Sequence, residues 1–271
     1  MENDFSLKNK VIVVTGGTGI LGNAFINGIA RAGGAVGILG RNEKVATERA
    51  QAIINQGGKA IALIADVTNE SQLIDAKKKL LAEFGKIDGL VNAAGGNIPE
   101  AVVQPDQDLF KLNIPALEQV MQSNLFGTIL PTQIFGEEMK NAGAGSIVNI
   151  SSVTAQLAVT KVLGYSMAKA SIDNYNQWFA VELAKRHGDK IRMNSIAPGF
   201  FLTEQNRTLL TNSDGSLTER GNLVIKNTPF NRFGSPDELI GALVWLLSDA
   251  SKFVTGSKIT VDGGFTIYSG V

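Results

Sequence analysis

The sequence predicts an α/β protein: one domain over residues 1–271, with a doubly wound, seven-stranded parallel sheet and helices on both of its faces. Two observations predict this class. Short β-branched apolar runs alternate with helical patterns along the chain, and no linker, repeat or low-complexity tract interrupts them. The first run also leads directly into a glycine-rich turn and a helix, which is the opening of a nucleotide-binding βαβ unit.

The elements are expected in a regular order. The strands are apolar runs bounded by turn residues, at 10–15, 35–40, 59–65, 87–92, 146–150, 191–197 and 257–261. The helices lie between them, at 23–32, 42–56, 67–84, 115–141 and 162–186, and from 235 onward. Asn124 and Pro131 lie inside the fourth helix and predict a break there, unless Asn124 is only a turn-facing polar residue. Residues 200–230 are polar with sparse apolar anchors, which fits a substrate lid better than a sheet element.

The composition excludes several classes of function. Basic and acidic residues balance at 25 each, so there is no electrostatic basis for binding nucleic acid or an anionic membrane. The chain has no cysteine and a single histidine, His187, expected near a helix end, so we expect no metal site. The polar start does not resemble a secretory signal, and no apolar run is long enough to span a membrane. We therefore expect a cytoplasmic protein.

The turn after the first strand reads Gly16-Gly-Thr-Gly-Ile-Leu-Gly22. Glycines let the backbone approach a pyrophosphate, and the N-terminus of the next helix attracts its charge. The spacing Gly-x-x-Gly-x-x-Gly differs from the commoner Gly-x-Gly-x-x-Gly by one displaced glycine. We expect the turn to bind the cofactor through Gly16, Thr18, Gly19, Ile20 and Leu21.

Residues at the ends of the second and third strands bear on the choice of cofactor. In nicotinamide-dinucleotide folds, an acidic residue after the second strand binds the 2′-hydroxyl of the adenosine ribose. This chain has Gly40 at that place and Arg41 beside it, and arginine can hold a phosphate. NADP is therefore favoured over NAD, although Arg41 could equally be a surface residue. Asp66 could bind the adenine amine or cap the following helix.

Tyr165 and Lys169 are four residues apart in a predicted helix, so their side chains share one face. An ammonium group beside a phenol favours the phenolate, so we expect Lys169 to lower the pKa of Tyr165. The alternative is an ordinary solvent-exposed pair. Ser152 follows the fifth strand and offers a hydroxyl at the carboxyl edge of the sheet, where parallel sheets bind ligands.

Together these motifs resemble the short-chain dehydrogenase/reductase family over nearly the whole chain. The resemblance is carried by Thr15-Gly16 with Gly19 and Gly22, Asp66-Val67, Asn92-Ala-Ala-Gly95, Pro198-Gly199 with Thr203, and Val261-Asp-Gly-Gly264. It implies a single NAD(P)-binding Rossmann domain. The cofactor contacts it implies are Asp66, Val67, Asn92, Ala93, Gly95, Tyr165, Lys169, Pro198, Gly199 and Thr203.

The same resemblance implies a catalytic set of Asn124, Ser152, Tyr165 and Lys169. In that set Tyr165 donates the proton and Ser152 stabilises the developing alkoxide. Lys169 binds the nicotinamide ribose, and Asn124 holds a water that links Lys169 to solvent.

A narrower resemblance lies within the family. Three stretches are similar to D-mannonate oxidoreductases (fructuronate reductases) and to gluconate 5-dehydrogenases. They are Gly95-Gly-Asn97, Phe201-Leu-Thr-Glu-Gln-Asn-Arg207 and the ending from Asp262. This implies hydride transfer between nicotinamide and a keto or hydroxy sugar acid, most of all D-fructuronate and D-mannonate. Arg207 is expected to bind the substrate carboxylate, unless it is a solvent-exposed lid residue. The remaining substrate contacts are expected from Asn97, Ser152 and Gln156.

The family also implies a homo-oligomer, commonly a tetramer, in which apolar C-terminal residues such as Phe265, Ile267 and Tyr268 would be covered. Two other functions stay open. One is reduction of a different carbonyl, such as 5-keto-gluconate, a 3-oxoacyl thioester, a steroid or an aromatic ketone. The other is a dinucleotide-binding sensor without turnover, although a sensor would have no need of Ser152, Tyr165 and Lys169 at working spacing.

Overall fold

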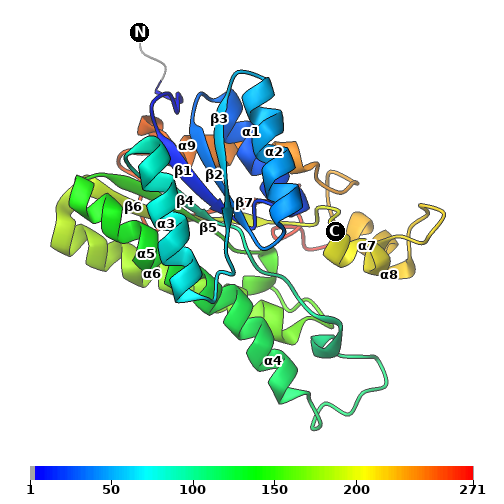
Figure 1. Cartoon of the computed structure of the whole chain (residues 1–271). Helices are drawn as coiled ribbons and strands as arrows, with labels where there is room; N and C mark the ends of the chain where they lie inside the picture. The colour runs from blue at the N-terminus through cyan, green and yellow to red at the C-terminus, as the bar shows by residue number, and fades with distance from the viewer. Residues whose placement is uncertain (1–3, 271) are drawn as a thin grey trace.

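The computed structural model describes residues 4–270. Residues 1–3, which begin the polar start of the chain, lie outside this description, as do residue 271 and the side chains of Glu204 and Gln205. Within the described residues the chain forms a central sheet between two layers of helices (Figure 1).

The sheet has seven strands in the order β3-β2-β1-β4-β5-β6-β7, and all neighbouring strands run parallel. The strands are β1 Val11–Thr15, β2 Ala35–Gly40, β3 Lys59–Ile64, β4 Gly89–Asn92, β5 Gly145–Ile150, β6 Ile191–Pro198 and β7 Lys258–Val261. The predicted fold class is therefore confirmed. The strand order reverses between β1 and β4, and open α/β sheets bind their ligands at such a point.

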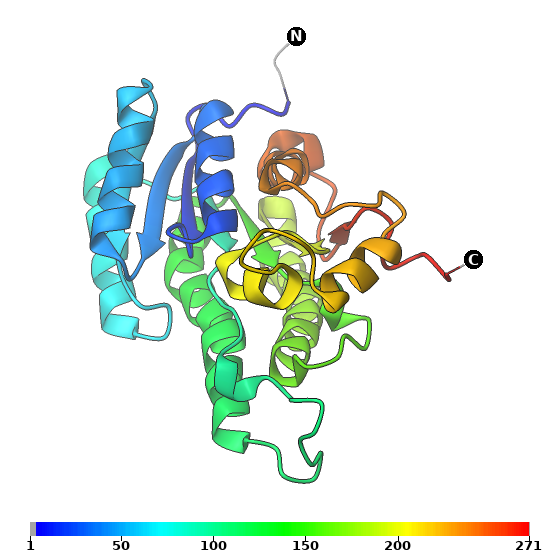
Figure 2. The same cartoon turned by 90° about the vertical axis from the view of Figure 1, so that its right-hand side faces the viewer.

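Alternating side chains of the strands pack against different helices. Ile12 and Val14 belong to the core on one face, whereas Val11 and Val13 belong to the core on the other. The first face is covered by α1 Ile20–Arg31, α2 Glu43–Asn55 and α9 Ile240–Leu247. The second is covered by α3 Glu70–Phe84, α5 Gly127–Ala142 and α6 Leu163–His187. Figure 2 shows these layers from the side.

Several helix ends follow the expected chemistry. Asn42 caps α2 by accepting a hydrogen bond from the Val45 N–H, as predicted. For α3 the cap is Asn69, so the cap suggested for Asp66 is wrong. Asp66 instead accepts two hydrogen bonds from Thr68, which closes a local turn. His187 is the last residue of α6, in a basic last turn that suits the helix dipole.

The predicted break in the 115–141 helix is present. α4, Ile114–Met121, is separated from α5 by a π-helical turn over Gln122–Phe126, and buried Asn124 lies at its centre. π-turns of this kind commonly occur at functional sites. Pro131 lies within α5, which continues through it. In both views α4 and the loop before it extend away from the sheet (Figures 1 and 2).

The polar stretch after β6 is more ordered than its sequence suggested. It forms α7, Glu204–Leu210, and α8, Glu219–Lys226. Phe201 and Gly234 form a β-bridge at the base of this excursion, which brings its two ends together. The final helix begins as predicted, because Ser235 and Glu238 form a capping box ahead of a short 3₁₀ turn and α9.

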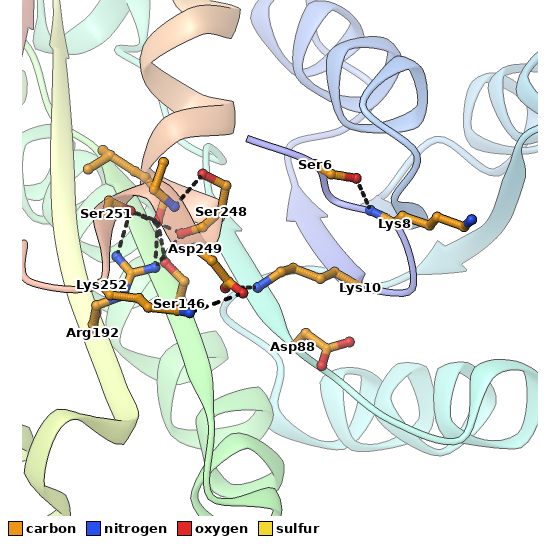
Figure 3. A network of polar contacts seen from close by, with 12 residues as sticks. Ser6, Lys8, Lys10, Asp88, Ser146, Arg192, Ser248, Asp249, Ser251 and Lys252 are labelled. Carbon is orange, nitrogen blue, oxygen red and sulfur yellow. Dashed lines mark hydrogen bonds and ion pairs between the residues drawn. The ribbon is translucent and has the colours of Figure 1, made fainter. Parts of the chain in front are cut away.

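A buried arginine joins α9 to the sheet (Figure 3). Arg192 in β6 donates hydrogen bonds to the carbonyls of Leu246 and Ser248 and to the Ser251 hydroxyl, at 3.0–3.1 Å. These carbonyls lie at the C-terminal end of α9, where a cation is favourable. Burial lowers the pKa of Arg192, and Asp249 counteracts that effect.

No helix between residues 4 and 270 is both long and apolar enough to cross a membrane. The same residues include no cluster of three or more histidine, cysteine, aspartate or glutamate side chains that could bind a metal ion.

Candidate active site

The turns after β1 and β4 lie side by side at the carboxyl edge of the sheet. The Thr15 hydroxyl accepts hydrogen bonds from the Ala93 and Ala94 N–H groups at 3.0 and 3.1 Å. Gly16 has φ of 66°, and a Cβ there would lie 2.7 Å from the Ala93 carbonyl oxygen. Only glycine can therefore occupy this position without moving the β4 turn.

The glycine turn has the features that a dinucleotide requires. A Cβ at Gly22 would overlap the Gly16 carbonyl oxygen, so Gly22 serves the packing of α1 against the turn. At Gly19 a Cβ would meet only the Gly16 carbonyl, at 3.4 Å, so packing within the protein does not require glycine there. Its missing side chain leaves the face next to the N-terminus of α1 open to a phosphate, which fits a bound dinucleotide.

Arg49 of α2 holds the glycine turn from behind, by donating hydrogen bonds to the Gly17 and Gly19 carbonyls at 2.6 and 2.8 Å. This contact joins residues about thirty positions apart, and no sequence signal indicated it. It satisfies two carbonyls of the turn, whose Gly17 and Gly19 N–H groups donate to the Leu39 and Gly16 carbonyls.

The predicted adenosine contacts also lie together. Arg41 is exposed and forms an ion pair with Asp66 at 3.7 Å, which links the ends of β2 and β3. Burial would raise the pKa of Asp66, but its hydrogen bonds from Thr68 and the charge of Arg41 together lower it. A Cβ at Gly40 would lie 2.7 Å from the Thr18 hydroxyl. The Thr18 side chain thus occupies the space beside residue 40, where an acidic residue would disfavour a 2′-phosphate.

Ser152 and Tyr165 approach each other across one end of the sheet. Ser152 follows β5 and accepts a hydrogen bond from the Thr154 N–H, while Tyr165 lies in the first turn of α6. Lys169 is one helical turn further on, and its ammonium donates a 2.8 Å hydrogen bond to the Ile150 carbonyl at the end of β5. Lys169 thus holds the Tyr165 helix against the strand that presents Ser152.

The net shift in the pKa of Tyr165 is opposite to the expected one. Burial raises the pKa of Tyr165 to about 12, and the hydrogen bond with Ser152 lowers it only in part. The ammonium of Lys169 lies over the Tyr165 ring, 5.3 Å from its centroid, but its hydrogen bond goes to the Ile150 carbonyl and not to the phenol oxygen. Burial also lowers the pKa of Lys169 to about 8, against the raising effect of Asp173. Without a ligand, the phenol is protonated at neutral pH.

Asn124 fixes the segment that follows β4. Its side-chain oxygen accepts from the Gly96 N–H at 3.0 Å, and its amide donates to the Gly96 and Val120 carbonyls at 2.7 and 2.8 Å. Asn97, the residue after Gly96, has both polar side-chain atoms buried without a partner among the described residues. Such atoms cost free energy unless a ligand or water satisfies them.

The side chain of Asn92, a predicted cofactor residue, is hydrogen-bonded within the protein core. Its side chain is buried and donates to Thr132 and Asn149, both at 2.9 Å, so it faces the core of the sheet and α5. Any cofactor contact of Asn92 must therefore come from its backbone or from its unpartnered side-chain oxygen.

A cavity of about 610 Å³ lies at this edge of the sheet. Several predicted residues line it: Leu21, Asn97, Ser152, Tyr165, Pro198, Gly199 and Thr203. Further polar side chains that the sequence did not single out also line it: Gln104, Ser151, Thr154, Asn206, Thr208 and Arg220. The rest of the lining is mainly apolar. A pocket of this size and composition suits a small polar ligand beside a cofactor.

Two predicted substrate residues lie outside this cavity. Arg207 is an exposed residue of α7 and is absent from the lining. Gln156 is exposed, and its side-chain oxygen accepts a 2.9 Å hydrogen bond from Lys258. The cation at the cavity is Arg220 of α8, which lies in the same polar stretch as Arg207. No local pattern distinguishes the two arginines, because only the fold of the stretch determines which of them faces inward.

Comparison with known proteins places this geometry among oxidoreductases. A family model described as enoyl-(acyl carrier protein) reductase matches residues 18–266. An uncharacterised oxidoreductase of Bacillus subtilis, UxuB, is 42% identical over 279 residues, which cover 98% of each protein. A proposed D-mannonate oxidoreductase from Haemophilus influenzae, solved with bound NAD, is 39% identical with a TM-score of 0.89 and 98% coverage of both chains. A gluconate 5-dehydrogenase from Burkholderia cenocepacia, solved with NADP and tartrate, is 33% identical with a TM-score of 0.84 and 97% coverage of both chains.

Proposed function

We propose that this chain, which belongs to the short-chain dehydrogenase/reductase family, reduces the keto group of a sugar acid and oxidises the matching alcohol, with D-fructuronate and D-mannonate as the pair. Family membership makes it an oxidoreductase that acts on CH–OH groups with NAD or NADP. The observation that carries the proposal is that Ser152 and Tyr165 line one cavity together with Leu21 of the glycine turn.

We assign the roles of the side chains from the family resemblance, and their positions support the assignment. When bound, the cofactor supplies the hydride. Tyr165 donates its phenolic proton to the carbonyl oxygen as negative charge develops there, and its raised pKa keeps that proton in place at neutral pH. Ser152 donates a hydrogen bond to the same oxygen and stabilises its charge. Lys169 lies one turn below and binds the cofactor ribose.

The polar part of the cavity supports a hydroxylated substrate. Asn97, with both amide atoms unpartnered, can bind hydroxyl groups, and so can Thr154, whose hydroxyl is also unpartnered among the described residues. The names of two similar proteins, a proposed D-mannonate oxidoreductase and a gluconate 5-dehydrogenase, also point to sugar acids. We propose that the excursion containing α7 and α8 is a lid over this substrate.

The test compares the wild type with Tyr165→Phe, with oxidation of NADPH or NADH as the readout. We expect D-fructuronate to be reduced by the wild type and kcat to fall roughly 10²–10⁴-fold in the variant, because the proton donor is lost. Cofactor binding, measured by fluorescence titration, should be nearly unchanged. Turnover retained in Tyr165→Phe would refute the assignment of the proton donor.

The same assay separates the competing functions. If the wild type prefers 5-keto-gluconate, a 3-oxoacyl thioester or an aromatic ketone, the protein is still a reductase but its substrate is not fructuronate. If the wild type binds the cofactor but reduces none of these compounds, a sensor is favoured.

A homo-oligomer is part of the proposal. Met167, Trp178 and Val181 of α6 are about half exposed, and Ile267 and Tyr268 are exposed beyond β7. Phe265 is not, because its ring packs edge-on against Phe200 at 5.0 Å. Large apolar side chains gathered on one helix suit burial against another copy of the chain. Light scattering on the purified protein should give the mass of a tetramer, and a monomer would contradict this part.

A further inference from the structure

We propose that Arg220 is the residue that selects an anionic substrate, by binding its carboxylate at the lid side of the cavity. The proposal rests on the function given above and adds a specificity-determining residue to it. Three features of the structure support it: the position of Arg220 in the cavity wall, the contacts between the two helices that position it, and the lack of a counter-ion among the described side chains.

The hairpin of α7 and α8 determines where Arg220 lies. Thr211 and Leu217 form an antiparallel bridge between the two helices, and the Thr218 N–H donates to the Leu210 carbonyl at 3.0 Å. A Cβ at Gly221 would overlap that same carbonyl oxygen, so the two helices are in direct contact there. Arg220, next to Gly221, is thereby turned toward the cavity.

Arg220 also connects the lid to the loop between Ser152 and Tyr165. Its guanidinium donates to the Thr160 hydroxyl at 3.1 Å and to the Thr160 carbonyl at 3.0 Å. Val159 and Val162, on either side of Thr160, line the cavity. The charge is therefore held at the cavity wall by two hydrogen bonds rather than left on a freely rotating side chain.

The charge of Arg220 is not balanced within the described residues. Both of its hydrogen bonds go to neutral oxygens, and it forms no ion pair there. Burial lowers its pKa, and no described carboxylate counteracts this effect. Among the described lining residues Arg220 is the only cation, and none is acidic. A partly buried charge without a counter-ion costs free energy, so an anion in the cavity would be bound favourably.

The guanidinium has donors left for such an anion. It carries five N–H groups, and Thr160 takes two of them. The remaining N–H groups can pair with the two oxygens of a carboxylate, which is the geometry that arginine recognises best. A neutral sugar of the same shape would gain nothing from this contact. The structure thus assigns to Arg220 the discrimination between a sugar acid and the corresponding sugar.

The test uses two ketones that differ in one group. D-Fructuronate carries a carboxylate where D-fructose carries a hydroxymethyl group, and reduction gives D-mannonate and D-mannitol respectively. We expect Arg220→Gln to lower kcat/KM for fructuronate about 10- to 100-fold, mainly through KM, since a charge-assisted hydrogen bond is lost. For fructose, which has no carboxylate, kcat/KM should change less than about threefold. A larger change would mean that the substitution damages the lid as a whole.

Matched variants separate charge from structure. Arg207→Gln, in the same lid but outside the cavity, should leave kcat/KM unchanged for both substrates. Thr160→Val removes the hydroxyl partner but keeps the charge and the contact with the Thr160 carbonyl, so it should lower kcat/KM for fructuronate less than Arg220→Gln does. Arg220→Lys should restore part of the preference. Equal losses for fructuronate and fructose in Arg220→Gln, or a loss in Arg207→Gln instead, would overturn the proposal.

Calorimetric binding of D-mannonate and D-mannitol to the protein loaded with reduced cofactor measures the same contrast without turnover, because neither alcohol can accept a hydride. Wild-type protein that binds mannonate through Arg220 but reduces no sugar acid would refute the proposed function and keep the role of Arg220. Active wild-type protein whose mannonate binding does not depend on Arg220 would refute the inference alone.

Discussion

Replacing Asn124 by alanine should both destabilise the protein and disturb its cavity. The Asn124 side chain makes three short hydrogen bonds, two to the Gly96 backbone and one to the Val120 carbonyl. The alanine side chain makes none of them. Asn124 itself is fully buried, so the two Gly96 groups lose their partner inside the protein, whereas the Val120 carbonyl keeps the hydrogen bond from the Ser123 hydroxyl.

The magnitude follows from those contacts. A buried polar group left without a partner costs about 1–3 kcal/mol. The Gly96 groups lie close to the cavity, where water can replace the lost amide in part, so the lower end of that range applies to each. The two Gly96 groups together give a loss of about 2 kcal/mol in the free energy of unfolding. Because Asn97 follows Gly96, KM for the sugar acid should rise as well.

Urea denaturation followed by the fluorescence of Trp178 and Trp245 measures the first effect, and steady-state kinetics measures the second. Ser123→Ala is the control, since Ser123 lies in the same π-turn and donates one hydrogen bond to the Val120 carbonyl. It should cost about 1 kcal/mol or less. A loss in Asn124→Ala no larger than in Ser123→Ala would refute the reasoning, and so would an unchanged KM.

Two further predictions concern buried charges. Arg192→Leu should lower the free energy of unfolding by about 1.5–3 kcal/mol, because hydrogen bonds from a charged group are lost while the Ser146 and Ser251 hydroxyls still donate to the same carbonyls. Lys10→Ala, which breaks an exposed ion pair with Asp249, should cost under about 1 kcal/mol in the same urea experiment. For Lys169 the folded pKa of about 8 lies below the ordinary 10.5, so the unfolded chain binds the proton more tightly and stability should increase with pH between those values. Between pH ~7.5 and ~9.5 the free energy of unfolding of the wild type should therefore increase by about 2 kcal/mol relative to that of Lys169→Met. If the free energies of unfolding of the two proteins change with pH in parallel, the lowered pKa is contradicted.

The sequence predicted the sheet well because its signals are local. A β-branched run, a glycine turn and a helix pattern each occupy a few neighbouring residues, and a parallel sheet then places all strand ends at one edge. For this reason Ser152 and Tyr165 could be assigned to one cleft before any distance was known. The break at Asn124 was predictable for a similar reason, because a polar residue interrupts an apolar helical stripe.

Other parts of the site depend on contacts between distant residues. Arg207 and Arg220 occur in the same polar stretch, and only the packing of α7 against α8 directs Arg220 to the cavity. Gln156 is engaged by Lys258, which is about one hundred positions away. Spacing along the chain contains no information about such pairs.

The sequence by itself therefore determined the fold class, the edge of the sheet that holds the site, and the residue types available there. Only the tertiary structure decided how each group is solvated. Spacing suggested that Lys169 would lower the pKa of Tyr165, but burial raises it to about 12. The physical reason is that a pKa depends on the free energy of removing a charge from water, and the surroundings that set this free energy are assembled from distant parts of the chain.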